Sequence, residues 1–101
     1  MKTYFGSRTN EGVCATVDDG RQMRDLAHQV RHSPTGFEWG YGGSGPADLA
    51  LSLLADALGD VKKAERLYQD FKWDVVAPLS ADHWMLTEAE IHGWVNQHLV
   101  V

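Results

Sequence analysis

The feature that most constrains the fold of this 101-residue chain is a nearly unbroken apolar run over residues 46–58. Only Asp48, Ser52 and Asp56 are clearly polar within it, and they stand four residues apart. At 3.6 residues per turn these three side chains form one narrow stripe, so leucine and alanine cover the rest of the circumference. The run therefore predicts a helix that is buried on most sides.

A glycine-rich aromatic loop over residues 33–45 leads into this helix. Pro46 suits the first turn of a helix, and Asp48 is placed favourably against the helix dipole. The segment before Pro46 has glycine at four of its six positions, 40–45. We predict a structural corner, in which glycines adopt positive φ and allow aromatic rings to pack on the backbone.

The first third of the chain has the alternation of β-strands. Residues 3–8 and 13–17 are separated by a turn-forming run, which predicts a hairpin. Residues 21–32 fit both a helical and a strand period, and we favour a third strand over about 26–32 because a lone hairpin is only marginally stable.

Two further helices are predicted after the buried one. Apolar residues recur at helical spacing over 61–77 and 88–99, and Thr87 with Glu90 forms a capping box before the last helix. Strands followed by helices favour an α+β fold, with an N-terminal three-stranded antiparallel sheet over about residues 2–32 and three helices packed on one face. The length favours a single domain over 1–101.

The charge is acidic and uneven. The formal net charge is -5, and residues 1–45 are neutral, whereas residues 46–101 carry four Lys or Arg against nine Asp or Glu. This disfavours nucleic-acid binding, which uses clustered basic residues, and is compatible with a basic partner. Cys14 is the sole cysteine, so no intramolecular disulfide is expected. We predict a cytoplasmic protein with an inert, buried Cys14 and no membrane segment.

Several chemistries can be weighed on the same residues. Residues 40–45 satisfy G-x-G-x-x-G before a helix, which allows an anion or nucleotide at the helix N-terminus, but the parallel strands of a dinucleotide fold are not predicted. His28 and His32 share a face and would need His83 or Glu38 to bind a metal. A hydrolytic set of Ser33, His32 and Glu38 is the weakest hypothesis. We predict no metal, cofactor or catalytic residue, and more readily a non-enzyme than an enzyme.

A contact surface is the favoured hypothesis for the loop. Phe37, Trp39 and Tyr41 alternate along the chain, so their rings point to one side, where they form either part of the core or a surface for a partner. Glu38 could accept a hydrogen bond from the loop backbone or from an arginine such as Arg31. The candidate contact residues are Glu38, Trp39, Tyr41, Gly42, Gly43, Ser44 and Gly45. Trp73 falls off its helix's apolar face, so it is a candidate exposed anchor, and a homodimer is a second kind of assembly that this pattern allows.

The residues 32–51, HSPTGFEWGYGGSGPADLAL, resemble an uncharacterised bacterial and phage family, the domain of unknown function numbered 6166. The likeness continues through residues 68–72, 75–77 and 84–94. The resemblance implies a compact stand-alone domain from phages or other mobile elements, and it assigns no activity to any residue. We therefore predict a small non-enzymatic protein-interaction module whose target is unknown, with an anion- or nucleotide-binding domain as the alternative.

Overall fold

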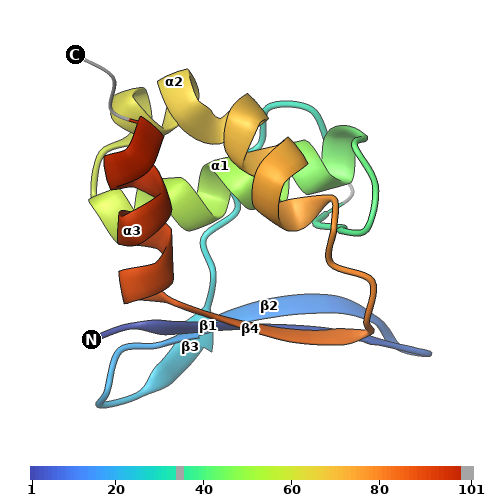
Figure 1. The fold of residues 1–101 in the computed structure, drawn as a ribbon. Helices are drawn as coiled ribbons and strands as arrows, with labels where there is room; N and C mark the ends of the chain where they lie inside the picture. Colours follow the sequence, from blue (N-terminus) through green and yellow to red (C-terminus); the bar gives the residue numbers. More distant parts are fainter. Residues whose placement is uncertain (34–35, 99–101) are drawn as a thin grey trace.

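A computed structural model describes residues 1–33 and 36–98 as a layer of helices over one face of an antiparallel sheet (Figure 1). Pro34 and Thr35 of the predicted loop and Leu99 of the predicted last helix lie outside the described residues. The α+β fold class, the antiparallel sheet and the three α-helices are confirmed.

The sheet is built from four strands in the order β3-β2-β1-β4, with every neighbouring pair antiparallel. The strands are β1 (Thr3–Thr9), β2 (Gly12–Asp18), β3 (Met23–Asp25) and β4 (His83–Thr87). The predicted hairpin is the β1–β2 pair, in which Tyr4 stands opposite Val17. Both of these side chains are buried against the helix layer.

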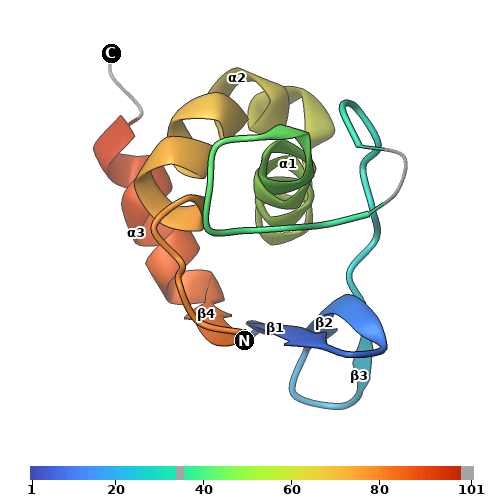
Figure 2. The same ribbon diagram turned by 90° about the vertical axis from the view of Figure 1, so that its right-hand side faces the viewer.

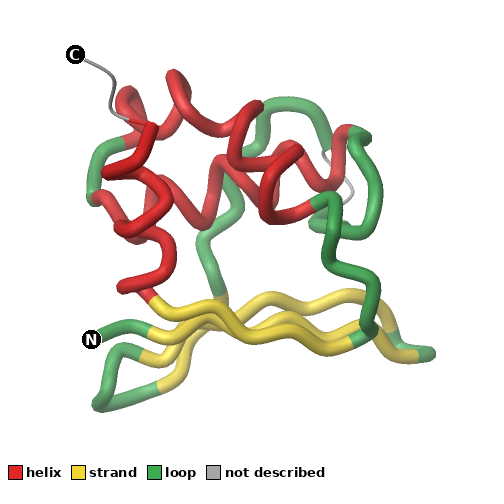
Figure 3. The backbone as a smooth tube through the Cα atoms, in the orientation of Figure 1, coloured by secondary structure: helices red, strands yellow, loops and turns green. Residues whose placement is uncertain are grey.

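The prediction of a three-stranded N-terminal sheet is wrong in two respects. A fourth strand, β4, arrives from the last quarter of the chain and pairs with β1, so that Tyr4 stands opposite Leu86. The third strand is β3, three residues long, and residues 26–32 form no strand. Residues 26–32, which we call the connecting segment, run from the sheet to the helix layer (Figure 3). Side chains of the central helix accept hydrogen bonds from several backbone N–H groups of this segment.

The helices are α1 (Ser44–Leu58), α2 (Val61–Phe71) and α3 (Glu88–His98), and a π-helical turn over Lys72–Val76 extends α2. Gly59, at a φ of 66°, ends α1 in the left-handed conformation that glycine adopts without strain. Asp60 then caps α2 by accepting a hydrogen bond from the backbone N–H of Lys63. The Thr87–Glu90 capping box forms as predicted at the start of α3.

Helix α1 is the centre of the molecule, as its apolar run predicted. Figure 2 shows it end on, with the sheet below and α2 above. Twelve of its fifteen residues are buried, and seven of these belong to one hydrophobic cluster that also includes residues of the sheet, α2 and α3. Over the parts of the chain that are described, no helix combines the length and the apolar character needed to cross a membrane.

Candidate functional site

The buried carboxylate of Asp48 fixes the segment that leads into the glycine-rich loop. It accepts hydrogen bonds from the backbone N–H groups of Arg31, His32 and Ser33, at 2.9–3.1 Å for the shortest contact of each. His28 Nε2 lies 2.9 Å from Asp48 Oδ2, the oxygen that also accepts from the Ser33 N–H. Burial acts to raise the pKa of Asp48, but these hydrogen bonds together lower it below the ordinary value. Asp48 therefore anchors the loop as an ionised group.

This role differs from the predicted one. The first turn of α1 begins at Ser44 and contains no acidic residue, so Asp48 lies in the second turn and does not act on the helix dipole as expected. Its side chain is fully buried and points to the segment before the loop. The polar stripe predicted the position of Asp48 on the helix but not its partners.

Ser52 and Asp56, the other two residues of the polar stripe, also hold neighbouring segments against α1. Ser52 Oγ accepts a hydrogen bond of 2.8 Å from the backbone N–H of Gln29. Asp56 accepts hydrogen bonds from the Tyr4 hydroxyl at 2.8 Å, from Arg24 at 3.0 Å and from Lys2 Nζ at 3.1 Å. The polar stripe thus attaches both the sheet and the connecting segment, residues 26–32, to α1.

Glu38 is held by Arg8 of β1. One guanidinium nitrogen of Arg8 donates to Glu38 Oε1 at 2.6 Å and to the Trp39 carbonyl at 3.2 Å. Of the two donors suggested for Glu38, the loop backbone is confirmed, because the Trp39 N–H donates to Glu38 Oε1 at 3.2 Å. The arginine is Arg8 and not Arg31, which binds Glu65 at 2.8 Å. The hydrogen bond to Glu38 raises the pKa of Arg8. This pairing fastens the extended part of the loop to the sheet.

Trp39 belongs to the core and not to a contact surface. Only 1% of it is exposed, and its indole N–H donates to the Ala81 carbonyl at 2.8 Å. Its ring meets Trp84 edge to face, with the centroids 5.6 Å apart. The hypothesis that Trp39 contacts a partner is therefore wrong, because the contacts with Ala81 and Trp84 hold this ring in the core.

The glycine corner presents two exposed aromatic rings. A Cβ built on Gly42 would lie 2.1 Å from the Trp73 ring, and one built on Gly43 would lie 2.4 Å from the Tyr41 ring. Tyr41 is 52% exposed and Trp73 is 59% exposed. We call Tyr41, Gly42, Gly43, Lys72 and Trp73 the aromatic corner. The rings cover adjacent glycines, as the interpretation of the loop as a corner predicted.

Lys72 completes the aromatic corner from the π-helical turn. Although the residue is buried, its Nζ donates to the Gly42 carbonyl at 3.2 Å and lies 4.5 Å from the centroid of the Trp73 ring. Gly40 precedes the corner at a φ of 89°, which favours glycine. The corner is therefore fixed by a cation on one side and by a left-handed backbone position on the other.

The last two candidate residues lie beside a polar hollow of about 340 Å³. Ser44 is exposed at its edge, and Gly45 is buried so tightly that an added Cβ would lie 2.8 Å from the Cβ of Glu38. Phe37, Glu38 and Tyr41 also line the hollow. A carboxylate in its wall makes the hollow a poorer site for an anion than the glycine pattern suggested.

The histidines are not brought together. His28 contacts Asp48, His32 Nε2 lies 2.7 Å from the Tyr68 hydroxyl, and His83 is on β4. Within residues 1–33 and 36–98, no three His, Cys, Asp or Glu side chains are close enough to share a metal ion. Ser33 Oγ donates to the Gly36 carbonyl, so it is not paired with His32 in a hydrolytic arrangement.

Cys14 is exposed, so the expectation of a buried thiol is wrong. Strand β2 buries Ala15 and Val17 on the side of the helices, and the alternation of a strand therefore turns Cys14 to the opposite face. The sequence placed Cys14 correctly in a strand but did not determine which face was covered.

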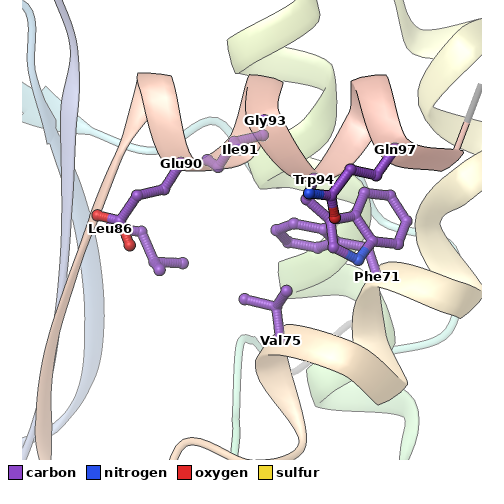
Figure 4. A pocket seen from close by; sticks show the side chains of 8 residues that line it. All are labelled: Phe71, Val75, Leu86, Glu90, Ile91, Gly93, Trp94 and Gln97. Atoms are coloured by element: carbon purple, nitrogen blue, oxygen red, sulfur yellow. The ribbon is translucent and has the colours of Figure 1, made fainter.

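A second hollow, which the sequence did not reveal, lies between β4, α3 and the end of α2. It is an apolar groove of about 400 Å³, and Figure 4 shows Leu86, Val75 and Phe71 on its walls below α3. Ile91 and Trp94 of α3 face the same space. We call this hollow the α3 groove.

The chain belongs to the Family of unknown function (DUF6166), whose model matches residues 4–97 and so covers nearly the whole chain. This confirms the resemblance seen in the sequence. No curated protein and no solved structure matches the chain.

Proposed function

We propose that this member of the family is a small non-enzymatic protein-interaction module that contacts its partner through the aromatic corner. The observation that carries the proposal is the exposure of Tyr41 and Trp73 above glycine backbone. Tryptophan and tyrosine are the side chains most enriched among residues that dominate binding energy at protein interfaces. Burying these rings against a partner would remove their apolar surface from water, which favours binding.

The rigidity of the corner supports the same proposal. Lys72 fixes the carbonyl of Gly42, and Arg8 fixes Glu38 and the carbonyl of Trp39, on either side of Tyr41. A surface whose backbone is already fixed loses less conformational entropy when a partner binds. Of the candidate residues in the loop, Tyr41, Gly42 and Gly43 remain in the proposed surface, and Trp73 joins them.

Affinity capture from the organism that encodes the chain tests the proposal. The double variant Tyr41→Ala/Trp73→Ala is compared with the wild type and with Met23→Ala, a matched control because Met23 is 58% exposed on β3. We expect a protein that is retained by the wild type and by Met23→Ala but not by the double variant. A partner that all three retain equally would contradict the proposal.

The alternative is an anion or nucleotide held at residues 42–47, at the N-terminus of α1. It is supported by the Lys72 ammonium beside Gly42 and by the absence of a side-chain cap on α1, whose N-cap is Gly43. It is opposed by Glu38 in the adjacent hollow. A ligand at a hundredfold excess over its Kd stabilises a protein by about 2.7 kcal/mol. A melting temperature unchanged by millimolar phosphate, sulfate and nucleotides would reject this alternative.

We also propose that the chain acts in the cytoplasm and derives from a phage or another mobile element. A single cysteine supports a reducing compartment. The proposed origin rests only on the likeness of residues 32–51 to a bacterial and phage family. Both proposals make a cytoplasmic host protein the first class of partner to test.

A further inference from the structure

Strand β4 is an open edge that nothing in its own sequence protects. The order of the described strands leaves β3 and β4 outermost, but β3 has three residues and β4 has five. Natural edge strands are usually blocked by shortness, proline or lysine. Strand β4, with the sequence HWMLT, carries neither proline nor lysine.

The hydrogen-bond register shows which groups of β4 face outward. Arg8 N–H donates to the Asp82 carbonyl, and Glu88 N–H donates to the Lys2 carbonyl. Because bonded positions alternate in an antiparallel pair, residues 82, 84, 86 and 88 bond toward β1. His83 and Met85 therefore turn their backbone N–H and C=O groups to the open edge, and both residues are exposed.

The α3 groove lies on the same flank as this edge. Leu86 of β4 forms one of its walls, and Val75 and Ile91 form others (Figure 4). Gly93 also lines the groove, and a Cβ built there would meet no atom within 4 Å. A strand added beside β4 would therefore direct alternate side chains toward a preformed apolar space.

The flank is acidic. Residues 73–101 contain Asp74, Asp82, Glu88 and Glu90 and no lysine or arginine. Glu90 lines the groove, and Asp74 binds the indole N–H of Trp94, another lining residue. Arg8 neutralises Asp82 in part, at 3.1 Å, whereas Asp74, Glu88 and Glu90 have histidine, hydroxyl or N–H groups as their partners.

We propose that β4 and the α3 groove bind an extended, basic segment of a partner protein, which adds a strand to β4 and inserts one large apolar side chain into the groove. Strand addition supplies main-chain hydrogen bonds, while pockets for alternate side chains supply specificity. A second copy of the chain is a poorer occupant, because two-fold pairing of β4 with itself would bring the same acidic flanks together. The inference uses none of the residues of the aromatic corner, so it does not depend on the proposed function.

Selection from a display library of random twelve-residue peptides tests this inference on the folded protein. Gly93→Leu serves as the counter-selection target, because Gly93 lines the groove and a Cβ there meets no atom within 4 Å, so a large side chain has room beside the groove. Gly93→Ala is the matched control with a single added methyl group. Met85→Pro removes an N–H that faces the open edge without removing a bond to β1, and Met85→Thr is its control. Circular dichroism confirms that each variant is folded.

We expect enriched peptides to carry a large apolar residue among lysines and arginines. They should bind the wild type, Gly93→Ala and Met85→Thr alike, and bind Gly93→Leu and Met85→Pro at least about tenfold more weakly. A selection without enrichment, an acidic consensus, or equal binding to Gly93→Leu would overturn the inference. Sedimentation that showed a dimer of the wild type and a monomer of Met85→Pro would assign the edge to a second copy instead.

The two proposed surfaces are separated by the same peptides. Binding lost in Tyr41→Ala/Trp73→Ala but kept in Gly93→Leu would support the aromatic corner and contradict the α3 groove. The reverse pattern would support the groove and leave the aromatic corner to its own capture experiment.

Discussion

Replacing Asp48 by asparagine should destabilise the fold more than any other conservative change on α1. Four donors converge on this carboxylate: His28 Nε2 and the backbone N–H groups of Arg31, His32 and Ser33. Asparagine keeps one acceptor oxygen and turns an NH₂ group toward the remaining donors. It therefore leaves about two of these partly or fully buried donors without an acceptor.

The expected cost follows from these contacts. Hydrogen bonds to a charged group contribute about 1.5–3 kcal/mol each, and a buried donor without a partner costs about 1–3 kcal/mol. We expect Asp48→Asn to lower the free energy of unfolding by about 3–5 kcal/mol, a large fraction of the roughly 5–15 kcal/mol of a small domain. With a urea m-value of about 1.5 kcal/mol/M, this loss lowers the midpoint of urea denaturation by about 2–3 M.

The pH dependence of the unfolding free energy tests whether Asp48 acts as an ionised group. The pKa of Asp48 is lowered in the folded state, so the unfolded chain binds more protons near its ordinary pKa of 3.8. The stability that Asp48 contributes is therefore present above that value and is lost as the pH falls through its folded-state pKa. The difference in unfolding free energy between wild type and Asp48→Asn should consequently shrink as the pH falls from 7 toward 3.

Ser52→Ala is the matched control, because it removes one hydrogen bond, from Gln29 N–H, and no charge. It should cost about 1 kcal/mol at every pH. An Asp48→Asn variant within about 0.5 kcal/mol of the wild type at pH 7, or a difference that persists unchanged in acid, would refute the assignment of Asp48 as an ionised anchor of the loop.

Three further changes test other parts of the structure. Gly93→Ala should raise the free energy of unfolding by about 1 kcal/mol in urea, since alanine favours a helix and its Cβ meets open space. Gly6→Ala should lower it by about 1–3 kcal/mol, because the new Cβ would lie 2.1 Å from the buried Trp84 ring. A double-mutant cycle on Arg8 and Glu38, both partly exposed, should give a coupling of about 0.5–1 kcal/mol that weakens in high salt.

The elements that are strongly patterned along the chain could be read from the sequence. The apolar run of α1, the β1–β2 hairpin and the capping box at Thr87 depend on residues within a few positions of one another. Local hydrophobic period, turn residues and caps are sufficient for such elements. Strand β4 shows a short alternation as well, but its partner β1 lies about 80 residues away in the chain, and no local pattern identifies that pairing.

The sequence by itself determined that α1 would be buried, that it would carry one polar stripe, and that glycines and aromatic rings would form a corner before it. Only the tertiary structure decided that Asp48 receives the segment before the loop, that Arg8 holds Glu38, and that Trp39 is buried while Tyr41 is exposed. The physical reason is that periodicity fixes which way a side chain points along its own element. What it meets there depends on elements that are distant in sequence and are brought together by packing around a common core.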